Sequence, residues 1–262
     1  MPSNPELRLI HSEIMVLLRR FDEVCAANGI SYTLDAGSLL GAVREHGFIP
    51  WDDDADIAMT RAEYEKFRDV ARTGVLGAGY TFREYASQHP RVWLNREGKP
   101  GAWIDIFIFD SISTSPLPRK MKLLGCAFFL AFTKNRESME VTRKANLHHG
   151  LKRALLNFGY TLGRPFTARF KARLMNAFCK HAFTGDGKWI HRSNTMYSEL
   201  GLVLPAGVMD EYIRVPFEDA ELMIVKRWHE MLVSSYGENY MTPVRYASHD
   251  NPQHAGFRGE DT

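Results

Sequence analysis

The spacing of apolar residues predicts that the chain begins with an amphipathic helix. Apolar side chains recur at helical intervals at Ile10, Ile14, Leu17, Leu18, Phe21, Val24 and Cys25. Asn4 and Pro5 are residue types that start helices, and Gly29 is one that ends them. We therefore expect one helix between these signals.

After this helix the pattern alternates between strands and helices. A short, partly β-branched run at 30–34 leads into the small-residue turn 35–38 and a short helix over 39–45. Polar and apolar residues then alternate over 54–59, which is typical of a strand with one polar edge. Thr60 and Glu63 have capping-box spacing, and they open a helix that ends near Gly74.

Three further strands are expected at 80–85, 91–95 and 102–110, and the last is apolar enough to be central in a sheet. These elements predict an α+β fold, with a mixed sheet and flanking helices over residues 1–115. The Ser- and Pro-rich stretch 113–118 marks the expected boundary. Residues 116–262 are expected to be a mainly helical region.

Within the second half, helical patterning covers 119–183, with breaks expected at Gly125, Gly150 and 163–165. A helix is expected over 228–240, in a C-terminal element that packs back on the core. The tail from Ser248 is expected to be loose.

Composition is that of an ordinary globular protein, with 45% hydrophobic and 24% charged residues. Cys25, Cys126 and Cys179 are far apart and odd in number, which fits neither a disulfide framework nor a zinc site. The N-terminal residues lack the pattern of a signal peptide, so a cytoplasmic location is expected. The most hydrophobic window, 123–132, is about half the roughly 20 residues that span a bilayer.

The strongest chemical signal is a cluster of carboxylates at 52–56. Asp52, Asp53, Asp54 and Asp56 would repel one another unless a cation lay among them. Strand alternation would put Asp54 and Asp56 on one face, about 7 Å apart along the backbone. Asp105, on the expected central strand, could complete a set of ligands for a hard cation such as Mg²⁺.

The acidic cluster also fits two structures that need no catalytic cation. A run of charges is commonly a solvated loop, although the neighbouring Trp51, Ile57 and Met59 prefer burial. The spacing of Asp52, Asp54, Asp56 and Glu63 also fits an EF-hand calcium loop. Ile57 stands where that loop needs glycine, which disfavours it.

A second signal lies just upstream, where Gly37 and Ser38 precede a helix. Such a turn lets backbone N–H groups approach a phosphate, and the helix N-terminus adds partial positive charge. Most Gly-Ser turns are only turns, so the pair alone is weak. Arg44, further along this helix, has the fork geometry that suits a phosphate or an aspartate.

The stretch GSLLGAVREHGFIPWDDDADI, together with WIDIFIFD around Asp105, resembles the signature of the LicD family, and also the catalytic segment of fukutin-related protein. The late segment YGENYM, residues 236–241, is similar to another element of that family. The resemblance implies a nucleotidyltransferase fold. It also implies that Asp54, Asp56 and Asp105 are catalytic and hold Mg²⁺ or Mn²⁺, while the donor contacts are Gly37, Ser38, Arg44, Trp51, Asp52 and Asp53.

For function, the resemblance implies transfer of a phosphate-linked group, such as phosphocholine, from a donor like CDP-choline. The acceptor would be a hydroxyl of a bacterial cell-surface glycan, such as teichoic acid or lipopolysaccharide, or of its lipid-linked precursor. Asp105 would bind a second ion or accept the proton of the attacking hydroxyl. Transfer of a nucleoside monophosphate to a small molecule, RNA or protein stays open as the alternative, as does a catalytically inactive glycan-binding module.

The middle of the chain carries an uneven charge. Residues 141–185 contain nine Lys or Arg and no Asp or Glu, interleaved with Leu, Phe and Tyr. Such a segment can rest on an anionic membrane, or it can be a helical cap with a solvated basic face. Its aromatic residues fit a core stripe at least as well as a stacking platform, so we expect no nucleic-acid partner.

Overall fold

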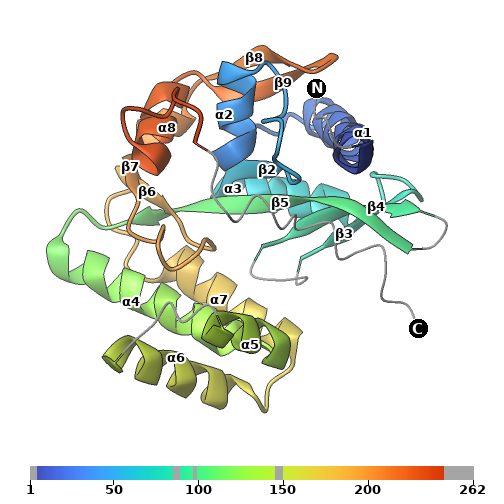
Figure 1. Cartoon of the computed structure of the whole chain (residues 1–262). Helices are drawn as coiled ribbons and strands as arrows, with labels where there is room; N and C mark the ends of the chain where they lie inside the picture. Colours follow the sequence, from blue (N-terminus) through green and yellow to red (C-terminus); the bar gives the residue numbers. More distant parts are fainter. Residues whose placement is uncertain (1–4, 85–88, 97–98, 145–149, 245–262) are drawn as a thin grey trace. The chain divides into compact units, whose positions relative to one another are not determined.

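The computed structural model describes residues 5–84, 89–96, 99–144 and 150–244, and the chain forms two compact units (Figure 1). The first unit joins Met1–Ile108 to Gly207–Thr262, and the second is Phe109–Ala206. Both contain helices and strands, which confirms the predicted α+β class. The domain division expected near residue 115 stays a prediction.

The first unit is built on a twisted sheet whose strands follow the order β1-β2-β5-β4-β3. The strands are β1 Thr33–Leu34, β2 Asp56–Thr60, β3 Tyr80–Arg83, β4 Arg91–Arg96 and β5 Lys99–Ile112. β5 lies between β2 and β4, as its apolar sequence predicts, and Ile104 and Ile106 are fully buried on it. The central position explains why this strand tolerates so few polar residues.

Helices α1 Pro5–Ala27, α2 Ala36–Arg44 and α3 Arg61–Ala71 belong to the same unit. The apolar stripe predicted for α1 is buried, including Ile14, Leu17 and Phe21. At the start of α3 the hydroxyl of Thr60 accepts a hydrogen bond from the Glu63 N–H, which is half of the predicted capping box. In a full capping box the Glu63 carboxylate would accept from the Thr60 N–H. Here that carboxylate accepts from the Ser31 N–H at 2.8 Å instead.

Several boundaries around the acidic segment differ from the prediction. α2 begins at Ala36 rather than at Leu39, since Ala36 adopts φ 45° and turns the chain directly into the helix. A left-handed conformation is costly for a residue with a Cβ. β2 begins only at Asp56, so Asp54 lies in the loop before the strand rather than on it.

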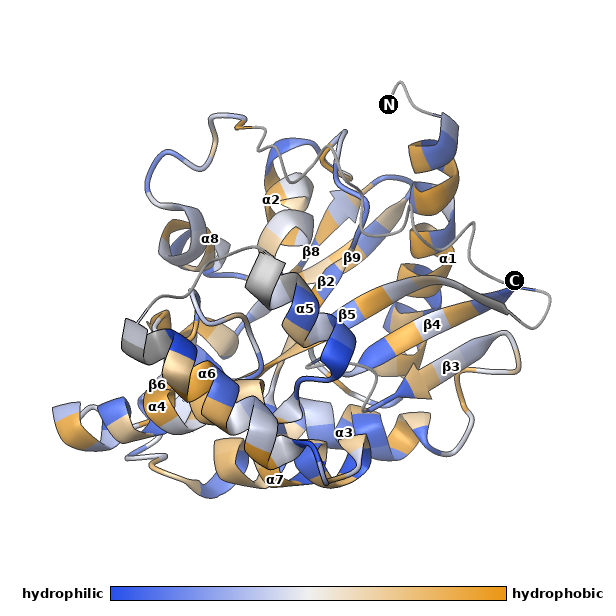
Figure 2. Cartoon of the chain, turned by 60° about the horizontal axis from the view of Figure 1, so that its bottom comes forward, coloured by the Kyte–Doolittle hydropathy of each residue, from blue (hydrophilic) through white to orange (hydrophobic). Residues whose placement is uncertain are grey.

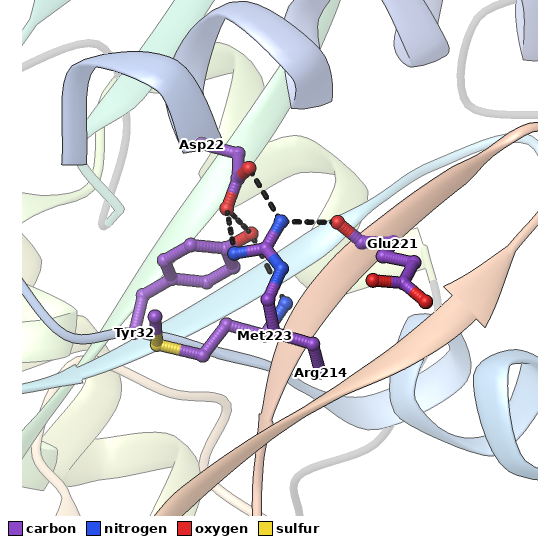
Figure 3. A network of polar contacts seen from close by, with 5 residues as sticks. All are labelled: Asp22, Tyr32, Arg214, Glu221 and Met223. Atoms are coloured by element: carbon purple, nitrogen blue, oxygen red, sulfur yellow. Dashed lines mark hydrogen bonds and ion pairs between the residues drawn. The ribbon is translucent and has the colours of Figure 1, made fainter. Parts of the chain in front are cut away.

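The C-terminal part of the first unit is a hairpin followed by a helix, β8 Tyr212–Phe217, β9 Ala220–Val225 and α8 Trp228–Tyr236. Figure 3 shows how the hairpin is held: Arg214 forms two hydrogen bonds with Asp22 of α1, at 3.1 and 2.7 Å. The Tyr32 hydroxyl donates to Asp22 and accepts from the Met223 N–H. The contacts of Arg214 and Met223 join residues more than 190 positions apart in the chain.

α8 ends four residues earlier than predicted. Gly237 follows it with φ 79°, a conformation that favours glycine and that stops the helix. The tail predicted from Ser248 lies outside the described residues.

The second unit is mostly helical, with α4 Pro116–Thr133, α5 Arg136–Lys144, α6 Gly150–Gly163 and α7 Ala168–His181. The end of β5 pairs there with β6 Trp189–Arg192, which pairs with β7 Val203–Pro205. The break predicted at Gly125 is wrong, since α4 runs through it. A Cβ on Gly125 would lie 2.0 Å from the ring of Phe178, so this glycine allows α4 and α7 to approach closely.

Within the described part of the chain, every helix is too short or too polar to cross a membrane.

Candidate active site

The carboxylates singled out in the sequence come together in the first unit, around the start of β2. Asp56 is the first residue of β2, and the loop 52–54 leads into it. Asp105 lies on the neighbouring strand β5, and its N–H donates to the Ala55 carbonyl at 3.1 Å. Asp35, which the sequence pattern did not single out as a site residue, is fully buried at the N-cap position of α2.

The turn before α2 is bonded directly to this strand. The Asp35 N–H donates to the Asp56 carbonyl at 2.9 Å, and the Asp56 N–H donates to the Ser38 hydroxyl at 3.0 Å. Ser38 is thereby used to position the acidic strand, and its backbone belongs to the first turn of α2. The N-terminal end of a helix, which favours anions, therefore lies beside the carboxylates.

The pKa of Asp56 is strongly raised. Burial raises its pKa well above the ordinary value, and the negative charges of Asp54, Asp105, Asp35 and Asp52 raise it further. Such crowding is unfavourable unless a proton or a cation compensates it. The arrangement therefore favours binding of a cation.

Three of the carboxylates are close enough to share one ion. Asp52, Asp53 and Asp54 each offer an oxygen atom, and these atoms lie within 4.8 Å of one another. Oxygen ligands on opposite sides of Mg²⁺ at 2.0–2.1 Å are about 4.2 Å apart, so this spacing fits a hard divalent cation. Oxygen donors alone are the set that Mg²⁺ or Mn²⁺ prefers.

This group differs in part from the set Asp54, Asp56 and Asp105 that the sequence suggests. Asp54 is common to both, and the negative charge of Asp105 is near enough to raise the pKa of Asp56. Both assignments of ligands stay proposals.

Asp105 has partners that the sequence pattern did not reveal. Arg91 donates to both of its oxygens, at 2.5 and 3.1 Å, and Trp103 donates its indole N–H at 3.3 Å. The Arg91 guanidinium also lies 4.8 Å from the centre of the Trp103 ring. Arg91 and Asp105 are direct cross-strand partners on β4 and β5, so only the register of the sheet could have revealed the pair.

Asp52 is held by the surrounding backbone. A Cβ added to Gly37 would lie 2.3 Å from its Oδ2, so only glycine at position 37 leaves room for this carboxylate. His11 of α1, stacked on Phe48, bonds through Nε2 to the Asp52 carbonyl at 2.6 Å. Because a carbonyl only accepts, Nε2 carries the proton, and burial lowers the pKa of this histidine.

The two remaining predicted site residues are Trp51 and Arg44. Trp51 is half-buried directly before Asp52. Arg44 lies at the opposite end of α2 from Gly37 and Ser38, where it donates to Glu45 at 2.7 Å and to the Tyr240 carbonyl at 3.4 Å. It links α2 to the segment 236–241, which is similar to another element of the LicD family, and its role in donor binding stays a prediction.

Comparison with known proteins agrees with this geometry. The sequence profile described as LicD/FKTN/FKRP, nucleotidyltransferase domain, matches residues 29–121. The chain has a LicD-family domain. The matched range contains the turn before α2, the acidic loop, β2 and Asp105, whereas His11 and the β8-β9 hairpin lie outside it.

The similarity continues beyond the LicD-family domain. The chain is 24% identical over 248 residues to the lipopolysaccharide cholinephosphotransferase LicD of Haemophilus influenzae, which covers 87% of this chain and 88% of that protein. Shorter stretches match uncharacterized proteins of Rickettsia typhi (39% identical over 54 residues, 21% of this chain and 18% of that protein) and Rickettsia prowazekii (46% over 43 residues, 16% of each).

The raised pKa of Asp52 predicts how the stability of the protein, and its stabilisation by Mg²⁺, depend on pH. Burial first, and the charge of Asp53 second, raise the pKa of Asp52 from 3.8 to about 6. An acid with a raised pKa takes up protons on folding, so the cation-free protein should lose stability as pH rises between these two values. A divalent cation needs the ionised carboxylate, so stabilisation by Mg²⁺ should be small at about pH 5 and larger at about pH 7.5.

Thermal unfolding with and without Mg²⁺ at both pH values measures this effect. Asp52→Asn should reduce the difference between the two pH values. Equal stabilisation at both, in the wild-type protein, would contradict the assignment of Asp52 to the cation site.

Proposed function

We propose that this chain is a metal-dependent transferase. It moves a substituted phosphate group, such as phosphocholine, from a nucleotide-activated donor such as CDP-choline to a hydroxyl of a cell-surface glycan or its lipid-linked precursor. The observation that carries the proposal is the similarity to the Haemophilus influenzae enzyme, which extends over 87% of this chain rather than over the domain alone.

The donor phosphates are proposed to lie against the first turn of α2. Gly37 and Ser38 provide backbone N–H groups there. The side of Gly37 where a Cβ would lie faces the Asp52 carboxylate, so the donor would approach beside the acidic loop. Trp51, Asp52 and Asp53 are proposed to shape the same site from the loop before β2, and Arg44 to support it from the other end of the helix.

We propose that Mg²⁺ or Mn²⁺ is held by Asp54 and Asp56, together with Asp52, Asp53 or Asp105. The ion would neutralise the donor diphosphate and the leaving phosphate. The raised pKa of Asp56 and the close oxygens of Asp52, Asp53 and Asp54 support this assignment.

Asp105 is proposed to bind a second ion or to accept the proton of the attacking hydroxyl. Its two oxygens already accept three hydrogen bonds, from Arg91 and Trp103, and an ionised carboxylate has about four acceptor positions. Arg91 therefore fixes the orientation of this carboxylate and leaves one position for the proposed role.

In this reaction the acceptor oxygen attacks the phosphorus that carries the choline, and the bond from that phosphorus to the bridging oxygen breaks. The nucleoside monophosphate leaves with the bridging oxygen, and the hydroxyl proton passes to a base.

Transfer of a nucleoside monophosphate is the second candidate, because the matching domain is described as a nucleotidyltransferase. In that reaction the attack falls on the α-phosphorus of a nucleoside triphosphate, and pyrophosphate leaves.

The leaving group separates the two reactions. Purified full-length protein is incubated with Mg²⁺, a lipid-linked glycan and a panel of nucleotide-activated donors, and the products are resolved by chromatography and mass spectrometry. We expect CMP from CDP-choline and a phosphocholine-sized mass increase of the acceptor. Pyrophosphate release with a nucleotide-sized increase would contradict the proposal and support the alternative.

A further inference from the structure

The helices of the second unit expose an unusual amount of apolar side chain. Large apolar residues are exposed on α4, α6, α7 and the link between the last two, among them Leu117 at 70% and Phe158 at 62%. Figure 2 shows hydrophobic residues recurring along these helices. The set is Leu117, Met121, Leu124, Leu155, Phe158, Leu162, Phe166, Phe170 and Leu174.

These side chains form stripes rather than isolated positions. Leu117, Met121 and Leu124 follow one face of α4 at helical spacing. Leu155, Phe158 and Leu162 do the same on α6, and Phe170 and Leu174 on α7. Each helix therefore presents an apolar face in addition to the face that packs in the core of the unit.

A chain of ring contacts connects the stripes. Phe158 of α6 contacts Phe128 of α4, which stacks on Phe132, with centroid distances of 6.4 and 5.9 Å. Phe132 contacts Phe166 at 5.7 Å, and Phe166 stacks on Phe170 of α7 at 5.0 Å. The exposed rings of Phe158, Phe166 and Phe170 are thus linked through the half-buried Phe128 and the buried Phe132. They form one apolar cluster and are not scattered singly over the helices.

The charge on the three helices that carry this surface has a single sign, whereas α5, which packs against α4 and α6, carries Glu137 and Glu140. α4, α6 and α7 contain no Asp or Glu. Exposed cations border the apolar stripes at Lys120, Arg153, Arg164, Arg169 and Arg173. Lys122 and Lys171 take no part, since both are buried and donate to backbone carbonyls.

We infer that this surface of α4, α6 and α7 docks on a lipid bilayer that carries anionic headgroups. Apolar side chains enter the boundary between headgroups and acyl chains, and the arginines pair with the lipid phosphates. Self-association through this surface would bring arginines against arginines without a balancing acid. Leucine and methionine side chains have no stacking role on nucleic-acid bases, which makes a nucleic acid a poorer fit.

Vesicle flotation with the full-length chain tests the inference. We expect the protein to float with vesicles of equal parts phosphatidylglycerol and phosphatidylcholine, to float poorly with phosphatidylcholine alone, and to be released in part by high salt. Arg169→Glu with Arg173→Glu should weaken partitioning by at least about fivefold for each arginine. Phe158→Ser with Phe170→Ser should weaken it by more than about tenfold.

Matched controls come from exposed residues elsewhere. Leu9→Ser with Val16→Ser on α1, and Arg8→Glu with Lys226→Glu, should leave vesicle binding unchanged, because all four residues belong to the first unit and not to α4, α6 or α7. Asp56→Asn should also bind vesicles normally, which separates this result from the fate of the proposed transfer reaction.

Three results would overturn the inference. The first is failure of the wild-type protein to float with anionic vesicles. The second is equal loss of binding in the test and control variants. The third is concentration-dependent self-association, or binding of RNA, that the Phe158 and Phe170 substitutions abolish while vesicle binding persists.

Discussion

Replacing Asp56 by asparagine is expected to reduce group transfer by about 10³-fold and to leave the protein folded. Asp56 begins β2 at the centre of the acidic cluster, where burial and neighbouring carboxylates raise its pKa. Asparagine keeps the shape of the side chain and removes its charge. Initial rates with saturating donor and Mg²⁺ measure the loss, and Asp54→Asn should behave similarly.

Asp56→Asn is expected to lower activity, but it should not lower the stability of the cation-free protein. The native state binds more protons than the unfolded state between the ordinary and the raised pKa of Asp56. Stability is therefore lost as pH rises through this interval, and the loss is complete above the raised pKa. Without divalent cation at neutral pH, the variant should unfold at the same temperature as the wild type or higher.

Adding Mg²⁺ should raise the unfolding temperature of the wild type more than that of Asp56→Asn. Retained transfer activity in the variant would refute the catalytic role of Asp56. A large loss of stability without cation would instead show that the carboxylate has a structural role.

Gly37→Ala is expected to lower transfer by about 10²-fold, the cost of misplacing a reacting group by about 1 Å. The new Cβ would lie 2.3 Å from Oδ2 of Asp52, so this carboxylate must leave the position that it holds beside Asp53 and Asp54. The displaced atom is the end of a side chain, so the overall fold should persist. Transfer rates as a function of Mg²⁺ concentration should show that more cation is needed.

Gly79→Ala is the matched control, because a Cβ there meets nothing within 4 Å. It should leave transfer and its dependence on Mg²⁺ unchanged. Wild-type activity in Gly37→Ala would mean that the position of Asp52 is unimportant for the reaction.

Much of the fold is readable from local patterns in the sequence. The apolar stripe of α1, the capping hydroxyl of Thr60 and the apolar run of β5 each reflect interactions between near neighbours in the chain, and all three appear in the structure. The acidic cluster was equally visible because four of its members lie within five residues. Ala36 shows the limit, since no local preference favours alanine at φ 45°.

The contacts that position the site depend on long-range pairing. Arg91 meets Asp105 only in the register that β4 and β5 adopt, and that register shifts between Trp93 and Asn95. Glu218 lies in the turn of the β8-β9 hairpin and accepts the Phe48 N–H at 3.1 Å. Its carboxylate occupies the space where Gly47 would have a side chain. Neither partner could be found from periodicity, because each is selected by the three-dimensional arrangement.

The hairpin that Arg214 fastens to Asp22 also affects how the protein is made and dissected. Because the first unit joins two segments that are far apart in the sequence, translation must pass the β8-β9 hairpin before that unit can close. Expressing residues 29–121 alone would leave out the histidine that holds the acidic loop and the arginine that binds α1. Such a fragment should be insoluble or unfolded, and shortened versions of the protein should retain both termini of this unit.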